Sequence, residues 1–166
     1  LLLHFGAVDW DAQVWVNGAF VGGHQGGYTP FTLDITDALS GPDVRVEVRA
    51  ADDHADMGQP RGKQDWHAEG TGHGIWYPRT SGIWQTVWLE CVPAARIVSL
   101  RWTPDVASLS VTLTATVTPE AVGGRIALRL GMNGDSLADE SYTLTGTTLT
   151  RTVSVPDPGI DDARDA

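Results

Sequence analysis

Apolar and polar residues alternate with a period of two along much of the chain. The alternation is clearest at residues 44–49, 109–118 and 125–132, where Val, Leu, Ile, Met or Ala recurs at every second position. This period is typical of strands that bury one face and expose the other. No stretch of a dozen residues keeps a helical period, and only one short turn is expected, at residues 35–39. The pattern therefore predicts an all-β chain.

Residues 12–22 have the pattern of a β-hairpin. Two apolar segments flank Asn17-Gly18, and these two residues tolerate the positive φ angles that a two-residue type I′ turn requires. The same reasoning places further strands between turn-rich segments. The full set of expected strands is 3–8, 12–16, 19–22, 31–35, 44–51, 83–91, 96–103, 109–118, 125–132, 140–144 and 148–155.

The composition changes near Val92-Pro93-Ala94-Ala95. Proline interrupts strand pairing, six of the seven Trp residues precede this point, and Thr, Ser, Val and Leu dominate after it. We therefore expect a jelly-roll-like β-sandwich over residues 1–94 and an immunoglobulin-like β-sandwich over residues 95–166. There is no initiator Met, and residues 156–166 are polar with no closing strand. We expect truncation at the N-terminus of the first sandwich and at the C-terminus of the second.

Charge and cysteine content exclude several classes of function. The net charge of −10 at pH 7 disfavours binding to nucleic acid or to an anionic membrane surface. No apolar run approaches the roughly 20 residues needed to span a bilayer. Cys91 is the only cysteine, so an internal disulfide and a zinc site built on several thiolates are excluded. The absence of disulfides favours a cytoplasmic location.

Residues 52–82 form an irregular segment far longer than the usual loop of about 4–6 residues. The segment contains Trp66, Trp76 and Tyr77 among carboxylates, amides and histidines. Aromatic faces beside fixed polar groups are what sugar recognition requires, because the C–H face of a pyranose stacks on a ring while polar groups bind its hydroxyls. Packing under the loop is the alternative role for these aromatic residues. Asp52-Asp53-His54 with Asp56 is interpreted as a solvated turn, because it lacks the glycine and distal glutamate of a calcium loop.

Three motifs occur in an order that is characteristic of one family. They are residues 3–9 with Gln13-Val14-Trp15-Val16-Asn17-Gly18, residues 21–31 with 33–39, and residues 79–90 around Ser81-Gly82-Ile83. Together they resemble the sugar-binding sandwich of glycoside hydrolase family 2, which contains β-galactosidases and β-glucuronidases. Residues 96–166 are similar in position and strand rhythm to the immunoglobulin-like domain that follows in that family.

The resemblance implies a retaining glycosidase whose two catalytic glutamates lie on a (β/α)₈ barrel elsewhere in the same polypeptide. Retention requires two carboxyl groups about 5–5.5 Å apart, and the barrel needs about 250 residues. This chain does not contain such a barrel, so we expect it to be inactive alone while its parent acts on a carbohydrate. Two alternatives stay open: a free-standing carbohydrate-binding module, and a structural module that forms a homo-oligomer.

The resemblance also suggests site residues. Aligned on Trp15-Val16-Asn17-Gly18, Asp9 stands where β-galactosidases have an Asn of the sugar pocket. Trp76, six residues before Gly82 of Ser81-Gly82-Ile83, stands where they have an Asp that binds substrate or a monovalent cation. No cofactor is expected, and the ligands of any monovalent or divalent cation in the parent enzyme are not identifiable here. The expected substrate-binding residues are Asp9, Trp10, Asp65, Trp66, His73 and Trp76. The strand residues Trp15, Trp84 and Trp88 are instead expected to pack in the core or between sheets.

Overall fold

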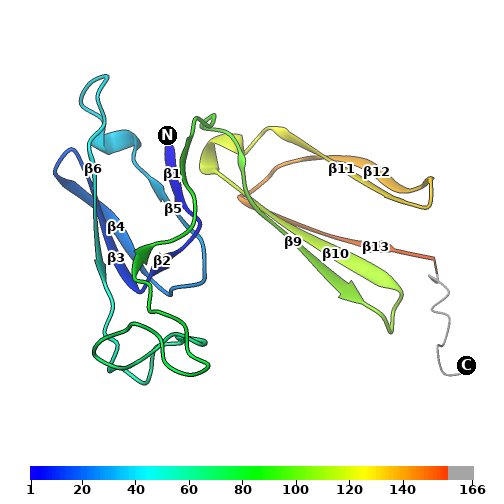
Figure 1. The fold of residues 1–166 in the computed structure, drawn as a ribbon. Coiled ribbons are helices and arrows are strands. Elements are labelled where there is room, and N and C mark those ends of the chain that lie inside the picture. The colour runs from blue at the N-terminus through cyan, green and yellow to red at the C-terminus, as the bar shows by residue number, and fades with distance from the viewer. Residues whose placement is uncertain (157–166) are drawn as a thin grey trace, which may run out of the picture. The chain divides into compact units, whose positions relative to one another are not determined.

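The computed structural model describes residues 1–156, and the chain divides into two compact units, Leu1–Val92 and a second unit that begins at Pro93 (Figure 1). Both units are built from β-strands, and the helical residues of the described part form two short 3₁₀ turns, η1 (Thr36–Ala38) and η2 (Pro119–Ala121). The prediction of an all-β sandwich fold is confirmed.

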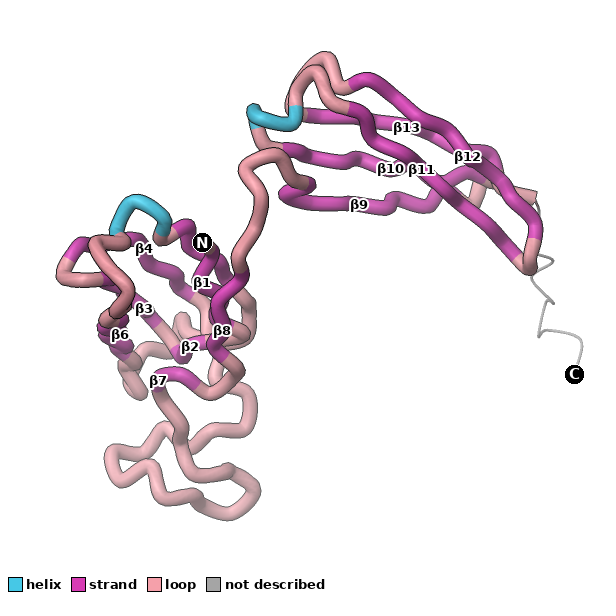
Figure 2. Tube along the Cα trace, turned by 90° about the horizontal axis from the view of Figure 1, so that it is seen from above, coloured by secondary structure: helices cyan, strands magenta, loops and turns pink. Residues whose placement is uncertain are grey.

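The first unit contains three small antiparallel sheets. Its strands are β1 (Leu2–Phe5), β2 (Val8–Asp9), β3 (Asp11–Val16), β4 (Ala19–Gln25), β5 (Phe31–Asp34), β6 (Val46–Ala51), β7 (Gly82–Ile83) and β8 (Val87–Glu90). The sheet orders are β5-β1-β8, β4-β3-β6 and β2-β7. Figure 2 shows that β6 and β7 are joined by residues 52–81, called here the long loop.

The alternating residues of β1 and β3 form the core of the first unit. Leu3 and Phe5 of β1 are 2% and 1% exposed, and Ala12, Val14 and Val16 of β3 are fully buried. These residues pack in one cluster, so the β5-β1-β8 and β4-β3-β6 sheets face each other across it. A period of two turns every second side chain inward, which is how the sequence pattern produces a sandwich.

The predicted β3–β4 hairpin is confirmed. Val16 pairs with Ala19, and Asn17 and Gly18 have φ angles of 50° and 83°, both in the left-handed region that the turn requires. The Asn17 side chain also fastens the hairpin to its surroundings. Its Nδ2 donates to the Ala38 carbonyl over 3.0 Å, and its Oδ1 accepts from the Arg45 N–H over 3.0 Å.

Two of the expected strands are each broken in the structure. The segment 3–8 divides into β1 and β2, and the segment 83–91 divides into β7 and β8, with each half in a different sheet. The two breaks lie side by side: the Gly6 N–H donates to the Thr86 carbonyl over 2.9 Å, and a Cβ at Gly6 would lie 2.7 Å from the Gln85 Cβ. The two segments of the chain therefore bend side by side, at a point where only glycine fits.

The core role expected for two tryptophans is wrong. Trp84 and Trp88 are 46% and 45% exposed. Trp84 lies between β7 and β8, and its indole N–H donates to the Gly27 carbonyl over 2.7 Å. Trp88 is on β8, an edge strand whose four residues are all exposed, and it stacks on His4 at 4.7 Å. The strand period located these residues but could not show that β8 lies at an edge.

The second unit is a pair of antiparallel sheets with the orders β13-β10-β9 and β11-β12. Its strands are β9 (Ile97–Asp105), β10 (Ser110–Val117), β11 (Arg125–Met132), β12 (Asp135–Thr143) and β13 (Thr148–Ser154). Leu113, Leu128, Ala138 and Val153 form the core between them. β12 starts earlier than the expected strand at 140–144. The expectation that no strand closes the sandwich after Pro156 concerns residues outside the described part of the chain.

A charged clamp connects the two sheets of the second unit. Arg151 of β13 donates from Nε and Nη2 to the two carboxylate oxygens of Glu140 on β12, each over 2.8 Å, and the Tyr142 hydroxyl donates to the same carboxylate. These hydrogen bonds, that from Arg151 above all, lower the pKa of Glu140 from 4.5 to about 2. Paired donors that match a carboxylate's geometry make this a strong contact.

Replacing Phe5 by Ala is expected to destabilise the first unit by about 3–5 kcal/mol, because the substitution opens a cavity in a closed core. The control is Phe20→Ala, since Phe20 is 61% exposed, and it should cost less than about 1 kcal/mol. Urea unfolding followed by circular dichroism measures both. Equal losses in the two variants would contradict this account of the core.

The Glu140 clamp makes the stability of the second unit dependent on acid. Because the folded pKa lies below the ordinary value, the stabilisation is present above pH 4.5 and is lost as the pH falls toward 2. Unfolding midpoints measured at about pH 6 and about pH 3 should therefore fall further in the wild type than in Glu140→Gln. Glu120→Gln, on the exposed η2 turn, should keep the wild-type pH dependence.

Candidate functional site

The long loop follows a defined path although it lies outside the strands and helices. The Ser81 hydroxyl donates to the Asp52 carboxylate over 2.6 Å and closes the base of the loop. Further out, the Tyr77 N–H donates to the Lys63 carbonyl over 2.8 Å, and the Asp65 N–H donates to the Tyr77 carbonyl over 2.9 Å. The two arms of the loop are therefore bonded to each other.

Asp65 is the buried polar centre of the long loop. It is 2% exposed, and its carboxylate accepts from the His67 N–H (3.0 Å), the His67 ring Nδ1 (2.7 Å) and the Gly72 N–H (3.1 Å). A carboxylate can only accept, so Nδ1 carries the proton in this contact. The hydrogen bonds from His67, and then that from Gly72, lower the pKa of Asp65 against the opposing effect of burial.

Aromatic and cationic side chains stack along the same loop. Trp66 meets Trp76 edge-on at 4.8 Å and lies against His67 at 4.9 Å, and His67 stacks on His73 at 4.7 Å. The Arg61 guanidinium lies over the Trp66 ring at 5.0 Å, which is a cation–π arrangement. Trp66 and Trp76 are half-buried while His73 is exposed, so part of this stack is open to a ligand.

Asp9 ends the short strand β2 next to the base of the long loop. It is 6% exposed, and its Oδ2 accepts from Gln64 Nε2 over 3.2 Å. On its other side lies Gly27, where a Cβ would come within 2.4 Å of Asp9 Oδ1. Burial and the neighbouring Asp52 carboxylate raise the pKa of Asp9, and the hydrogen bond from Gln64 opposes them.

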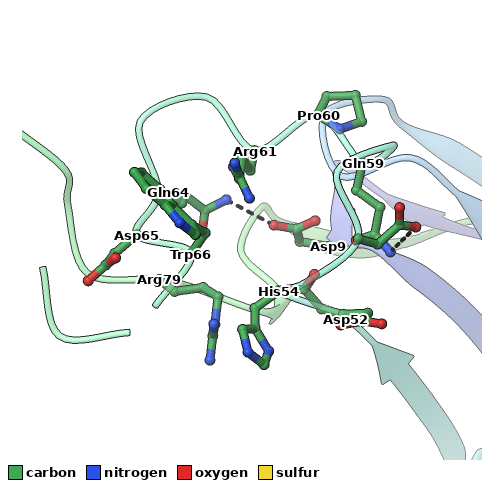
Figure 3. Close-up of a pocket in the computed structure, with 12 residues that line it drawn as sticks. Asp9, Asp52, His54, Gln59, Pro60, Arg61, Gln64, Asp65, Trp66 and Arg79 are labelled. Carbon is green, nitrogen blue, oxygen red and sulfur yellow. Dashed lines mark hydrogen bonds between the residues drawn. The ribbon is translucent and has the colours of Figure 1, made fainter. Parts of the chain in front are cut away.

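A small cavity of about 20 Å³ adjoins Asp9 (Figure 3). Its lining comes from the strand end and both arms of the long loop: Asp9, Asp52, Asp53, His54, Asp56, Gln59, Pro60, Arg61, Gln64, Asp65, Trp66 and Arg79. A space of this size holds about one water molecule, whereas pockets for small ligands take about 300–1,000 Å³. The cavity is therefore too small to enclose a sugar ring.

The structure brings together half of the residues expected to bind substrate. Asp9, Asp65 and Trp66 line the cavity. Trp10, His73 and Trp76 lie outside it. Figure 3 shows the Asp65 carboxylate directed away from Asp9, toward its own partners in the loop. Trp10 is half-buried, and its carbonyl accepts from the Gly26 N–H over 3.1 Å.

Two residues beside Asp9 were not anticipated from the sequence. Gln64 reaches Asp9 from a position 55 residues away in the chain, and Gly27 packs against the Asp9 carboxylate from a third segment. Gln64 stands in the loop that the sequence singled out, but its spacing carries no signal for a contact with Asp9. Gly27 is one of 19 glycines, and the sequence does not distinguish it from the others.

Residues 1–156 contain neither a metal-binding cluster nor a membrane-spanning helix. In that part of the chain, no three His, Cys, Asp or Glu side chains come together in a way that could hold a metal ion. The carboxylates of Asp53 and Asp56 instead accept from the backbone N–H groups two residues further on, which is typical of turns. None of the described helices has the length and apolar character to cross a membrane.

Comparison with known proteins identifies relatives among glycosidases. A scan of protein-family models gives no match. The chain is 33% identical over 116 residues to a putative β-glucuronidase of Formosa agariphila, covering 69% of the chain and 13% of that protein. It is 34% identical over 117 residues to a β-galactosidase of Thermoanaerobacter pseudethanolicus, covering 68% of the chain and 15% of that protein. The chain thus spans about one seventh of these curated relatives.

Solved structures show the same fold. The crystal structure of a glycosyl hydrolase family 2 member from Bacteroides cellulosilyticus superposes with a TM-score of 0.58 at 22% identity, covering 93% of this chain and 21% of that one. At this identity the likeness shows the fold alone. The chain is thus an all-β sandwich segment that is similar in sequence and in fold to glycosidases. The chain is related to glycoside hydrolase family 2 over the part of those enzymes that it covers.

Asp65→Asn is expected to loosen the long loop while leaving the sandwich folded, because an amide cannot accept from all three N–H groups. Hydrogen exchange should become faster at the His67 and Gly72 backbone amides by about tenfold or more. Glu69→Gln changes an exposed carboxyl group of the same loop and serves as the control. Unchanged exchange in Asp65→Asn would contradict the organising role of Asp65.

Proposed function

We propose that the chain is a non-catalytic segment of a retaining family 2 β-glycosidase. In this proposal residues 1–94 are the sugar-binding jelly-roll-like sandwich and residues 95–166 belong to the immunoglobulin-like sandwich. The two catalytic glutamates lie on a (β/α)₈ barrel of the same polypeptide. The first sandwich lines and supports the substrate pocket of that barrel, and the chain does not hydrolyse glycosides alone.

The environment of Asp9 is the observation that carries this proposal. A buried carboxylate with one oxygen occupied by Gln64 is held at a strand end, beside a cavity with room for about one water molecule. A carboxylate held in this way can accept a hydrogen bond from a sugar hydroxyl, but the chain provides no space around it for the ring. In this proposal the sugar ring lies outside the cavity, and a neighbouring domain supplies the remaining walls of the pocket.

The other residues expected to bind substrate differ in how accessible their side chains are. Trp66 and Trp76 are half-buried and His73 is exposed, so these side chains keep surface that can meet a sugar ring or the barrel. Asp65 acts mainly through the loop that it organises, because its carboxylate already accepts three N–H groups. Trp10 follows Asp9 in the chain and is half-buried, so its contact with a sugar stays a proposal.

The substrate class proposed is a β-linked glycoside of a simple hexose or a uronic acid. The names of the two curated relatives, a putative β-glucuronidase and a β-galactosidase, make β-glucuronides and β-galactosides the first compounds to test. Nitrophenyl derivatives of both, hydrolysed by the polypeptide that continues past Ala166, would measure the activity. A stop codon directly after Ala166 would contradict the proposal.

Gly27→Ala tests the role of Asp9 in that enzyme. The added Cβ would come within 2.4 Å of Asp9 Oδ1 and must displace the carboxylate, so kcat/KM should fall by about tenfold or more. The control is Gly41→Ala, because a Cβ at Gly41 meets nothing within 4 Å. A fall in kcat/KM of the same size in both variants would show that Asp9 is not the cause.

Titration of the 166-residue chain with sugars separates this proposal from a free-standing carbohydrate-binding module. The accessible tryptophans of the long loop favour such a module as the second candidate. With the pocket incomplete, we expect no saturable change of Trp fluorescence with millimolar methyl β-galactoside or methyl β-glucuronide. Saturable quenching that is lost in Trp76→Ala would favour the binding module instead.

A further inference from the structure

The orientation of the Gln64 side-chain amide is fixed by its partners. The Thr80 N–H donates to Gln64 Oε1 over 2.8 Å, and the Thr80 hydroxyl donates to the same atom over 3.3 Å. A backbone N–H must face an oxygen, so the amide cannot be flipped and Nε2 must face Asp9. Thr80 therefore fixes the orientation in which Gln64 donates to Asp9.

The two oxygens of Asp9 are consequently different. Oδ2 accepts from Gln64 over 3.2 Å, while Oδ1 has no hydrogen-bond partner within residues 1–156. The backbone of Gly27 lies against Oδ1, so the carboxylate cannot rotate toward that side. Oδ2 is thus hydrogen-bonded, while Oδ1 is held in position and can still accept a hydrogen bond.

We propose that Gln64, oriented by Thr80, is a positioning residue that holds the Asp9 carboxylate and leaves Oδ1 to accept a hydrogen bond from a sugar hydroxyl. This inference rests on the proposed function. It adds a chemical preference, because a held carboxylate accepts from hydroxyl or ammonium groups and repels another carboxylate. The group of the sugar that meets Asp9 is therefore a ring hydroxyl and not the carboxylate of a uronic acid.

Nearby charges point to the same preference. Four further aspartates line the cavity with Asp9, against the two arginines Arg61 and Arg79. Arg61 faces Trp66, and its Nη1 atom is buried without a hydrogen-bond partner in the described chain. Its charge is engaged with the Trp66 ring, and the carboxylates that line the cavity outnumber the guanidinium groups. Anionic groups of a substrate are therefore disfavoured next to Asp9.

The contact is tested first in the 166-residue chain, without any substrate. Gln64→Glu replaces the donor to Asp9 by a second carboxylate, so the pKa of Asp9 measured by carboxyl NMR should rise by about one pH unit or more. Gln64→Met removes the donor without adding charge and should give a smaller rise. This second variant keeps the test valid if the glutamate variant does not fold.

Gln25→Glu is the matched control. Gln25 Nε2 donates to Asp11 Oδ2 over 3.3 Å on the exposed β3–β4 pair, so this change creates the same kind of carboxylate pair outside the cavity. The pKa of Asp9 should stay at its wild-type value. An unchanged Asp9 pKa in both Gln64 variants, or an equal rise in Gln25→Glu, would overturn the positioning role.

Kinetics of the longer polypeptide then distinguish this inference from the proposed function. We expect Gln64→Glu to lower kcat/KM for a β-galactoside by about tenfold at neutral pH, and the loss to be partly recovered in acid as the new pair shares a proton. Asp9→Ala should remove the same activity without recovery in acid. If Asp9→Ala lowers kcat/KM but Gln64→Glu does not, the positioning role fails alone; if neither does, the function proposed for Asp9 fails as well.

Discussion

The Asp65 carboxylate and its three N–H donors hold the long loop in place, and the candidate site depends on this contact. The loop has no sheet or helix to order its backbone, so a buried acceptor takes that role. Once residues 65–72 are closed around the carboxylate, the preceding residue, Gln64, is carried to a fixed position. Gln64 then meets Asp9, which the sandwich supplies.

Asp9 and Asp65 show how the environment decides what an aspartate does. Asp65 has three donors, which lower its pKa despite burial, and it acts as a permanent anion that organises the backbone. Asp9 has one donor and a carboxylate neighbour, so burial dominates and raises its pKa. The first is saturated by its partners, while the second keeps an unused oxygen. Only the second has capacity left for a ligand.

The size of the cavity agrees with the proposal that this segment supports a pocket completed by another domain. A cavity of about 20 Å³ lies beside the Asp9 carboxylate. The curated relatives are about seven times longer than the part that matches this chain. A sandwich gives rigid strand ends and loops, on which a residue can be placed accurately. Enclosing a sugar takes a second surface, which fits the proposal of a supporting role for this chain.

The sequence by itself determined the strands, the hairpin turn and the family relationship. Strand period and Asn-Gly turns are local properties, so the burial of Leu3, Val14 and Leu113 and the positive φ angles at Asn17 and Gly18 could be predicted from neighbouring residues. The same local rule failed for Trp88, because its exposure depends on β8 lying at an edge. The strand period also missed the breaks at residues 6–7 and 84–86, where two segments of the chain bend side by side.

For the candidate site, the sequence identified Asp9 and the long loop, but only the tertiary structure decided how they meet. The contacts of Asp9 with Gln64 and Gly27 join three segments that are distant in the chain, and no period or spacing encodes such a contact. The structure likewise decided that Asp65 faces its own loop. Which oxygen of a carboxylate is free depends on every donor around it, and those donors are assembled only by folding.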